Sequence, residues 1–183
     1  MNSRVEQEAS AGAQRDTAAD VTSAVVEQSS NGGPEVHASP EVIRLHGRKV
    51  VGGVTEGEAL VTRQTISGWG GVNPTTGTII ETRHELRGVS FKDKVLVCPG
   101  AKGSSGWSAM FHTTRLAGTA PKAVIFNEMT TKIALGCVVM RVPSITDLDR
   151  DPLELIESGD WVKVDADNGL VEIRKKRPAC PSS

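Results

Sequence analysis

The chain has 183 residues, a formal net charge of −1, and only three Trp, three Phe and no Tyr. Such a balance argues against a nucleic-acid surface, which needs a basic face or base-stacking aromatic residues. No apolar run approaches the roughly 20 residues of a membrane-spanning helix, and residues 1–8 lack the apolar stretch of a secretory signal. We therefore expect a cytoplasmic protein that binds neither nucleic acid nor membrane.

The three cysteines are odd in number and far apart in the sequence, and they form no Cys-x-x-Cys pair. Cysteines in this pattern are typical of reduced thiols in a cytoplasmic protein. Cys98 and Cys137 lie in apolar runs and are predicted to be core residues, whereas Cys180 is predicted to be exposed. The chain by itself offers no set of residues with metal-ligand spacing.

Composition divides the chain into three parts. Residues 1–38 are rich in Ala, Ser, Glu, Gln and Asp, and such a segment cannot bury enough apolar surface to fold. We predict a disordered N-terminal tail over 1–38, one folded domain over 39–176 and a flexible C-terminal tail over 177–183.

The first half of the domain is predicted to consist mainly of strands, over residues 42–51, 58–65 and 78–81. A glycine-rich loop over 67–77 contains Trp69, which either contacts another molecule or plugs the edge of the core. A polar connection follows and contains His84. This histidine is either a general base or substrate ligand, or an ordinary surface-loop residue.

The centre of the chain predicts a strand, a glycine loop and a helix in succession. Residues 95–98 form a short apolar run, Gly100, Gly103 and Gly106 punctuate the loop, and helical spacing of apolar residues follows over 106–117. Ser104 and Ser105 stand at the junction, where free N–H groups of a helix N-terminus can stabilise an anion or a serine oxygen. The alternative is that one of them simply caps the helix.

The second half mixes strands and short helices. Strands are predicted over 122–126 and 137–141, helices over 130–136 and 152–157, and a hairpin over 161–164 and 170–174 around Asp167-Asn168-Gly169. Asn127 and Glu128 follow a predicted strand, at the position where parallel sheets often place functional polar groups.

Three ordered motifs resemble the small, swivelling domain of the aconitase X family. They are Gly100-Ala101-Lys102-Gly103-Ser104-Ser105-Gly106-Trp107-Ser108, Ser67-Gly68-Trp69-Gly70-Gly71-Val72-Asn73-Pro74-Thr75-Thr76-Gly77 and Arg83-His84-Glu85-Leu86-Arg87-Gly88. The resemblance extends from about residue 47 to residue 174. It implies an α/β fold, namely a compact β/β/α swivelling domain with a partly closed mixed sheet.

The resemblance also implies a function. The family dehydrates small hydroxy acids, and its iron–sulfur cluster lies on a large subunit, so this chain resembles the small subunit of a two-chain hydro-lyase. The position in the motif makes Ser104 the base. Lys102 stands where the family often has Arg, and it can pair with a carboxylate. The remaining candidates for substrate binding are Gly103, Ser105, Ser108, Trp69 and His84.

Two substrates follow from the family, cis-3-hydroxy-L-proline and mevalonate 5-phosphate, and the long N-terminal tail favours the first. Two functions of other classes stay open. One is a non-catalytic module that binds an anion in the glycine loop. The other is a phosphocarrier swivelling domain, but residues 100–108 contain no histidine to carry a phosphoryl group.

Overall fold

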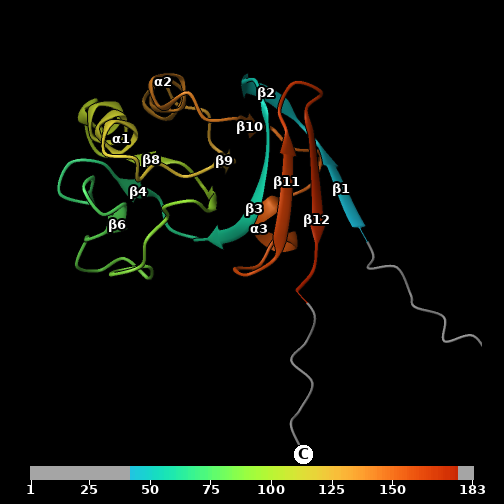
Figure 1. The fold of residues 1–183 in the computed structure, drawn as a ribbon, viewed down its shortest axis with the longest axis horizontal. Helices are drawn as coiled ribbons and strands as arrows, with labels where there is room; N and C mark the ends of the chain where they lie inside the picture. Colours follow the sequence, from blue (N-terminus) through green and yellow to red (C-terminus); the bar gives the residue numbers. More distant parts are fainter. Residues whose placement is uncertain (1–41, 177–183) are drawn as a thin grey trace, which may run out of the picture. The chain divides into compact units, whose positions relative to one another are not determined.

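The fold is seen in a computed structural model, which describes residues 42–176 (Figure 1). The predictions for the tails, 1–38 and 177–183, and for Cys180 lie outside these residues. No helix within the described part of the chain is long and apolar enough to cross a membrane.

One eight-stranded sheet forms the framework, with strand order β1-β12-β11-β3-β7-β9-β10-β2. Its four central strands β3, β7, β9 and β10 are parallel to one another, and the outer strands are antiparallel to their neighbours. The strands are β1 (Val42–His46), β2 (Arg48–Val51), β3 (Val54–Val61), β7 (Val95–Cys98), β9 (Ala123–Phe126), β10 (Ser144–Thr146), β11 (Trp161–Asp165) and β12 (Leu170–Arg174).

The two edges of this sheet are joined by a single residue. β1 and β2 stand at opposite ends of the strand order, yet only Gly47 separates them in the chain. The sheet must therefore curl until its edges meet. A Cβ atom at Gly47 would lie 2.8 Å from Ile145 Cγ2 and from the carbonyl oxygen of Thr146, so only glycine fits this crossing. The predicted mixed and partly closed sheet is confirmed.

The central strands are buried on both faces, because each face packs against a different core. In β7, Leu96 and Cys98 belong to one apolar cluster and Val95 and Val97 to the other, and β9 alternates in the same way. The second cluster lies inside the curled sheet. The first lies between β7 and β9 and a layer of helices and loops.

That layer contains helices α1 (Gly106–Leu116) and α2 (Thr131–Met140), which pack side by side (Figure 1). It also contains four two-residue strands, β4 (Ile66–Ser67), β8 (Ala101–Lys102), β5 (Val72–Asn73) and β6 (Thr78–Ile79). β4 pairs with β8 in parallel, and β5 pairs with β6 in antiparallel fashion. A short helix, α3 (Pro152–Leu155), packs Leu153 and Leu155 against the second apolar cluster, inside the curled sheet.

Most predicted elements are confirmed, with changed ends. The predicted strand over 42–51 is broken at Gly47, and the strand predicted over 58–65 is β3, which begins at Val54 and ends at Val61. The strand predicted over 137–141 is wrong, because residues 137–140 belong to α2 and Arg141 is the residue that ends this helix. The buried residues of α2 follow helical spacing: Ile133, Gly136, Cys137 and Met140. The prediction of a strand considered only the short apolar run and missed this spacing.

Candidate functional site

The glycine–serine loop connects β8 to α1 and is held from two sides. The β4–β8 pairing sets Lys102 opposite Ser67, and the ammonium of Lys132 on α2 donates to the carbonyl oxygen of Gly103 over 2.7 Å. Gly103 has φ +87°, a backbone conformation that costs a side chain energy and glycine little. The loop therefore has a fixed path into the helix.

The three serines of the motif have different surroundings. Ser104 is exposed, and its Oγ accepts a hydrogen bond from the backbone N–H of Gly106 over 3.3 Å. Ser105 is the residue before α1 but makes no side-chain capping bond. Ser108 is buried, and its hydroxyl donates to the carbonyl oxygen of Ser105 over 3.1 Å. Only Ser104 combines an accessible hydroxyl with a backbone donor directed at its oxygen.

Trp69 lies beside this junction. A Cβ atom placed on Gly106 would be 3.4 Å from Ser104 Oγ and 3.9 Å from side-chain atoms of Trp69, so the two side chains flank the first residue of α1. Trp69 is 74% exposed, and the interpretation that it plugs the core is therefore wrong.

The tryptophan that does fill the core is Trp107. It stacks on Phe111 with ring centroids 3.9 Å apart, and its Nε1–H donates to the carbonyl oxygen of Ile66 over 3.0 Å. Gly68 and Gly136 pack so closely against it that a Cβ atom would lie 2.4 Å from its Cα or 2.0 Å from its ring, respectively. Trp107 thus fixes the position of α1, and with it the serine loop.

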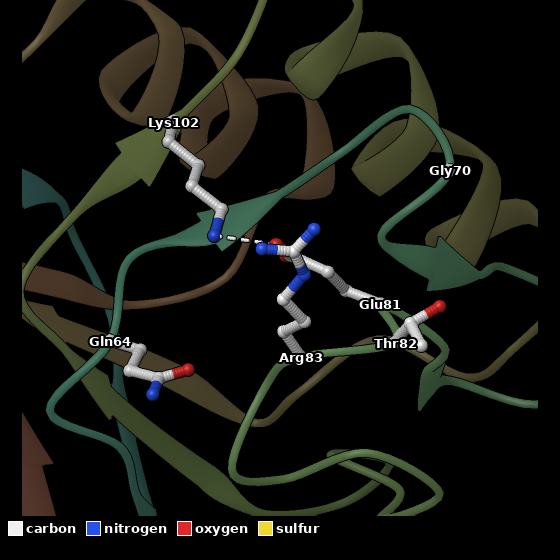
Figure 2. Close-up of a pocket in the computed structure, with 6 residues that line it drawn as sticks. All are labelled: Gln64, Gly70, Glu81, Thr82, Arg83 and Lys102. Atoms are coloured by element: carbon white, nitrogen blue, oxygen red, sulfur yellow. Dashed lines mark ion pairs between the residues drawn. The ribbon is translucent and has the colours of Figure 1, made fainter.

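A pocket of about 780 Å³ opens beside Lys102 (Figure 2). Its lining carries three charged side chains. The ammonium of Lys102 pairs with Glu81 Oε1 over 2.6 Å, whereas Arg83 forms no ion pair with any described residue. The other oxygen, Glu81 Oε2, is buried without a hydrogen-bond partner among residues 42–176. The pocket is lined by Gln64, Gly70, Glu81, Thr82, Arg83 and Lys102.

His84 is buried, so the interpretation of this histidine as an ordinary surface-loop residue is wrong. The side chain is 4% exposed and does not line the pocket, and its Nδ1 accepts the backbone N–H of Leu86 over 3.1 Å. A neutral ring with Nδ1 as acceptor carries its proton on Nε2, and that nitrogen is buried with no partner in the described part of the chain. His84 therefore cannot reach a substrate in the pocket unless the connection moves.

Glu85, the next residue, ties the connection to the end of β3. Its Oε1 accepts from the Thr62 hydroxyl and from the backbone N–H of Arg63, the latter over 2.6 Å. The hydrogen bond from Thr62 is the main cause of a lowered pKa for the Glu85 carboxyl, and the bond from Arg63 acts in the same direction. Glu85 is consequently ionised, and it holds the connection against the end of β3.

Asn127 stands at the end of β9, where a functional polar group was predicted. Its Nδ2 donates to Asp151 Oδ1 over 2.9 Å, and the same oxygen accepts the backbone N–H of Leu153 to cap α3. Both contacts tie the helix to the sheet. They give Asn127 a structural role.

The two described cysteines do not suit an iron–sulfur cluster. Both are buried, as predicted, and burial raises the pKa of the Cys98 thiol to about 12 and that of Cys137 to about 11. A cluster binds thiolates, which these side chains resist forming. Within residues 42–176 no three His, Cys, Asp or Glu side chains come together as a metal site.

Residues 44–173 match the sequence model of the aconitase X swivel domain. The chain belongs to the aconitase X family. The small subunit of phosphomevalonate dehydratase from Thermococcus sibiricus is 40% identical over 133 residues, which are 73% of this chain and all of that protein. The corresponding subunit from Methanosarcina acetivorans is 38% identical and is covered to 94% of its length.

The fold agrees with a solved member of the family. The crystal structure of Thermococcus kodakaraensis aconitase X in its holo form superposes with a TM-score of 0.69 at 38% identity and covers 73% of this chain and 99% of that one. This aconitase X chain is therefore the small, swivel-domain subunit of a dehydratase, and the chemistry is that of a hydro-lyase.

Five of the six pocket residues were not among the predicted site residues of this aconitase X chain: Gln64, Gly70, Glu81, Thr82 and Arg83. They come from three separate segments, and the β4–β8 pairing and the turn after β6 bring them to Lys102 (Figure 2). Gly70 and Arg83 each lie in one of the three family motifs, and those positions were the available signal.

Proposed function

We propose that Ser104 is the base of a two-chain dehydratase, in which this chain supplies the proton acceptor and a large subunit supplies the metal chemistry. The base removes a proton from the carbon beside the substrate's carboxylate. Hydroxide leaves from the neighbouring carbon, and a carbon–carbon double bond remains. An iron–sulfur cluster on the large subunit would act as the Lewis acid for the leaving hydroxyl.

The hydrogen bond from Gly106 N–H to Ser104 Oγ carries this proposal. A serine hydroxyl is a weak base, and its deprotonated form needs stabilisation to take part in proton transfer. A backbone donor at a helix N-terminus supplies that stabilisation without bulk. The Lys132 ammonium on the preceding carbonyl adds positive charge close to the loop.

The remaining members of the motif are given supporting roles. Gly103 lets the loop turn, and Ser108 holds the carbonyl of Ser105 from the buried side. Ser105 is exposed and makes no cap, which leaves its hydroxyl for the substrate. Trp69 stands exposed over the start of α1, where it would meet substrate or the large subunit.

We propose mevalonate 5-phosphate as the first substrate to test, because relatives 34–40% identical to this chain are named phosphomevalonate dehydratase small subunits. The preference for cis-3-hydroxy-L-proline rested on the length of the tail. This compound remains the second candidate. Both compounds carry a hydroxyl on the carbon next to the proton that must be removed.

The test is solvent exchange of that proton in the enzyme reconstituted from this chain and a coexpressed large subunit. Ser104→Ala should assemble normally and lose exchange by several orders of magnitude, because the proton then has no acceptor. Ser105→Ala is the matched control and should lose no more than roughly tenfold. Exchange at the wild-type rate in Ser104→Ala would show that another group is the base. If the reconstituted enzyme converts neither compound, the substrate assignment is refuted, but the assignment of Ser104 as the base is not.

A further inference from the structure

We propose that Arg83, rather than Lys102, binds the anionic group of the substrate, a carboxylate or a phosphate ester. The inference rests on the proposed function, because the pocket that Arg83 lines also contains Lys102 of the glycine–serine motif. It assigns a binding role to a residue that lies outside the glycine–serine motif.

Lys102 is not available for this role. Its ammonium lies 2.6 Å from Glu81 Oε1, and the Glu81 side chain is only 25% exposed. The second oxygen of Glu81 is buried with no hydrogen-bond donor in the described part of the chain. Moving Lys102 to a substrate would leave a largely buried carboxylate without any partner, which is unfavourable. Lys102 is therefore committed to Glu81 and shapes the wall of the pocket.

Arg83 is placed differently. It lies two residues beyond Glu81, is exposed, lines the same pocket and pairs with no acidic residue of the described chain. Figure 2 shows its guanidinium directed toward the region of the Lys102–Glu81 pair. An anion that binds Arg83 displaces no internal ion pair. The planar guanidinium can also hold a carboxylate or phosphate through two parallel hydrogen bonds, which an ammonium cannot do.

Gln64 adds a second donor to this wall. Its Oε1 accepts a hydrogen bond from the backbone N–H of Glu85 over 3.2 Å. This contact orients the side chain and leaves the amide NH₂ group to donate to a bound anion. Arg83 and Gln64 thus both offer hydrogen-bond donors to one pocket, while Glu81 is neutralised by Lys102. The site matches a small anion.

The kinetic test compares Arg83→Gln with Arg87→Gln in the reconstituted two-chain enzyme. Arg87 is exposed in the same connection but does not line the pocket, so it controls for a loss of surface charge. Loss of charged hydrogen bonds to the substrate should raise KM by roughly 10- to 100-fold in Arg83→Gln and change kcat much less. Arg83→Lys should recover part of the affinity, and Arg87→Gln should keep the wild-type KM. Equal KM values in the Arg83→Gln and Arg87→Gln enzymes would overturn the inference and leave the proposed function standing.

A binding test separates the two anion chemistries without any turnover. The full chain, labelled with ¹⁵N, is titrated with sodium phosphate and, separately, with sodium propionate at constant ionic strength. A shift of the Arg83 Nε–H signal with phosphate alone indicates a phosphate ester, and a shift with propionate indicates a carboxylate. If the Arg83 signal moves and the reconstituted enzyme turns over no hydroxy acid, the anion site stands and the reaction assignment fails. If neither anion moves it more than the Arg87 signal, the inference is wrong.

Discussion

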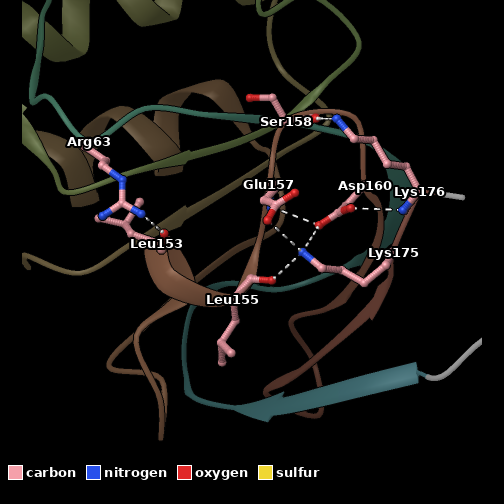
Figure 3. A network of polar contacts seen from close by, with 8 residues as sticks. All are labelled: Arg63, Leu153, Leu155, Glu157, Ser158, Asp160, Lys175 and Lys176. Carbon is pink, nitrogen blue, oxygen red and sulfur yellow. Dashed lines mark hydrogen bonds and ion pairs between the residues drawn. The ribbon is translucent and has the colours of Figure 1, made fainter. Parts of the chain in front are cut away.

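Asp160 joins the two ends of the C-terminal hairpin to the loop before it, and its replacement by Asn tests how the curled sheet is stabilised (Figure 3). The side chain is fully buried. One carboxylate oxygen accepts from Glu157 N–H and from the Lys175 ammonium, each over 2.9 Å, and the other accepts from Lys176 N–H over 3.0 Å. Every donor around it requires an acceptor.

Asn at this position keeps the shape but offers only one acceptor oxygen. In either orientation of the amide, one backbone N–H, that of Glu157 or that of Lys176, faces the NH₂ group and loses its acceptor. The Lys175 ammonium loses its anionic partner, although it keeps the carbonyl oxygen of Leu155 at 3.1 Å. Hydrogen bonds to charged groups contribute about 1.5–3 kcal/mol each, so the expected loss in the free energy of unfolding is about 3 kcal/mol. For a domain of this size that lowers Tm by roughly 10 °C.

Urea and thermal unfolding of the full chain at pH 7 measure this loss, with Glu157→Gln as the matched control. Glu157 is 67% exposed and lies 3.8 Å from the same ammonium, so its replacement should cost less than about 1 kcal/mol. If Asp160→Asn and Glu157→Gln unfold within about 0.5 kcal/mol of each other, the buried network does not hold the hairpin as described.

The pH dependence provides an independent check on Asp160. Although burial by itself would raise the pKa of this carboxyl, the hydrogen bonds from Lys175, Glu157 and Lys176 outweigh it, and the pKa is lowered in the folded state. The stabilisation from ionised Asp160 is therefore complete above the unfolded pKa of about 3.9 and is lost as the pH falls through the lower folded value. Asp160→Asn should lose less stability than the wild type over that acidic range.

Two further variants test the packing around the serine loop and its exposed face. Gly136→Ala should destabilise the fold by about 1–3 kcal/mol in urea unfolding, because the new Cβ would lie 2.0 Å from the Trp107 ring. The control Leu135→Ala changes an exposed side chain and should alter the free energy of unfolding little. Equal effects of the two substitutions would contradict the close packing. In a Trp161→Phe background, the emission of Trp69 should shift to the blue when the large subunit binds, since Trp107 is already buried, and an unchanged spectrum would show that Trp69 stays in solvent.

The sequence by itself determined the local elements of this protein. The apolar run of β7, the glycine loop and the helical stripe of α1 were read from spacing alone, because burial imposes a period on each element. Pro152 at the start of α3 and the Asn168-Gly169 turn between β11 and β12 were equally local. Three ordered motifs were sufficient to indicate the aconitase X family, which the comparisons confirm.

Tertiary structure decided what lies next to what. Curling of the sheet through Gly47 and burial of His84 depend on partners far away in the chain, and no local pattern encodes them. The same holds for the pocket, where Lys102 and Glu81 are 21 positions apart and meet only because β8 lies beside the turn after β6. Charges interact through space rather than along the sequence. Only the folded chain could therefore show that, among residues 42–176, Lys102 has an acidic partner and Arg83 has none.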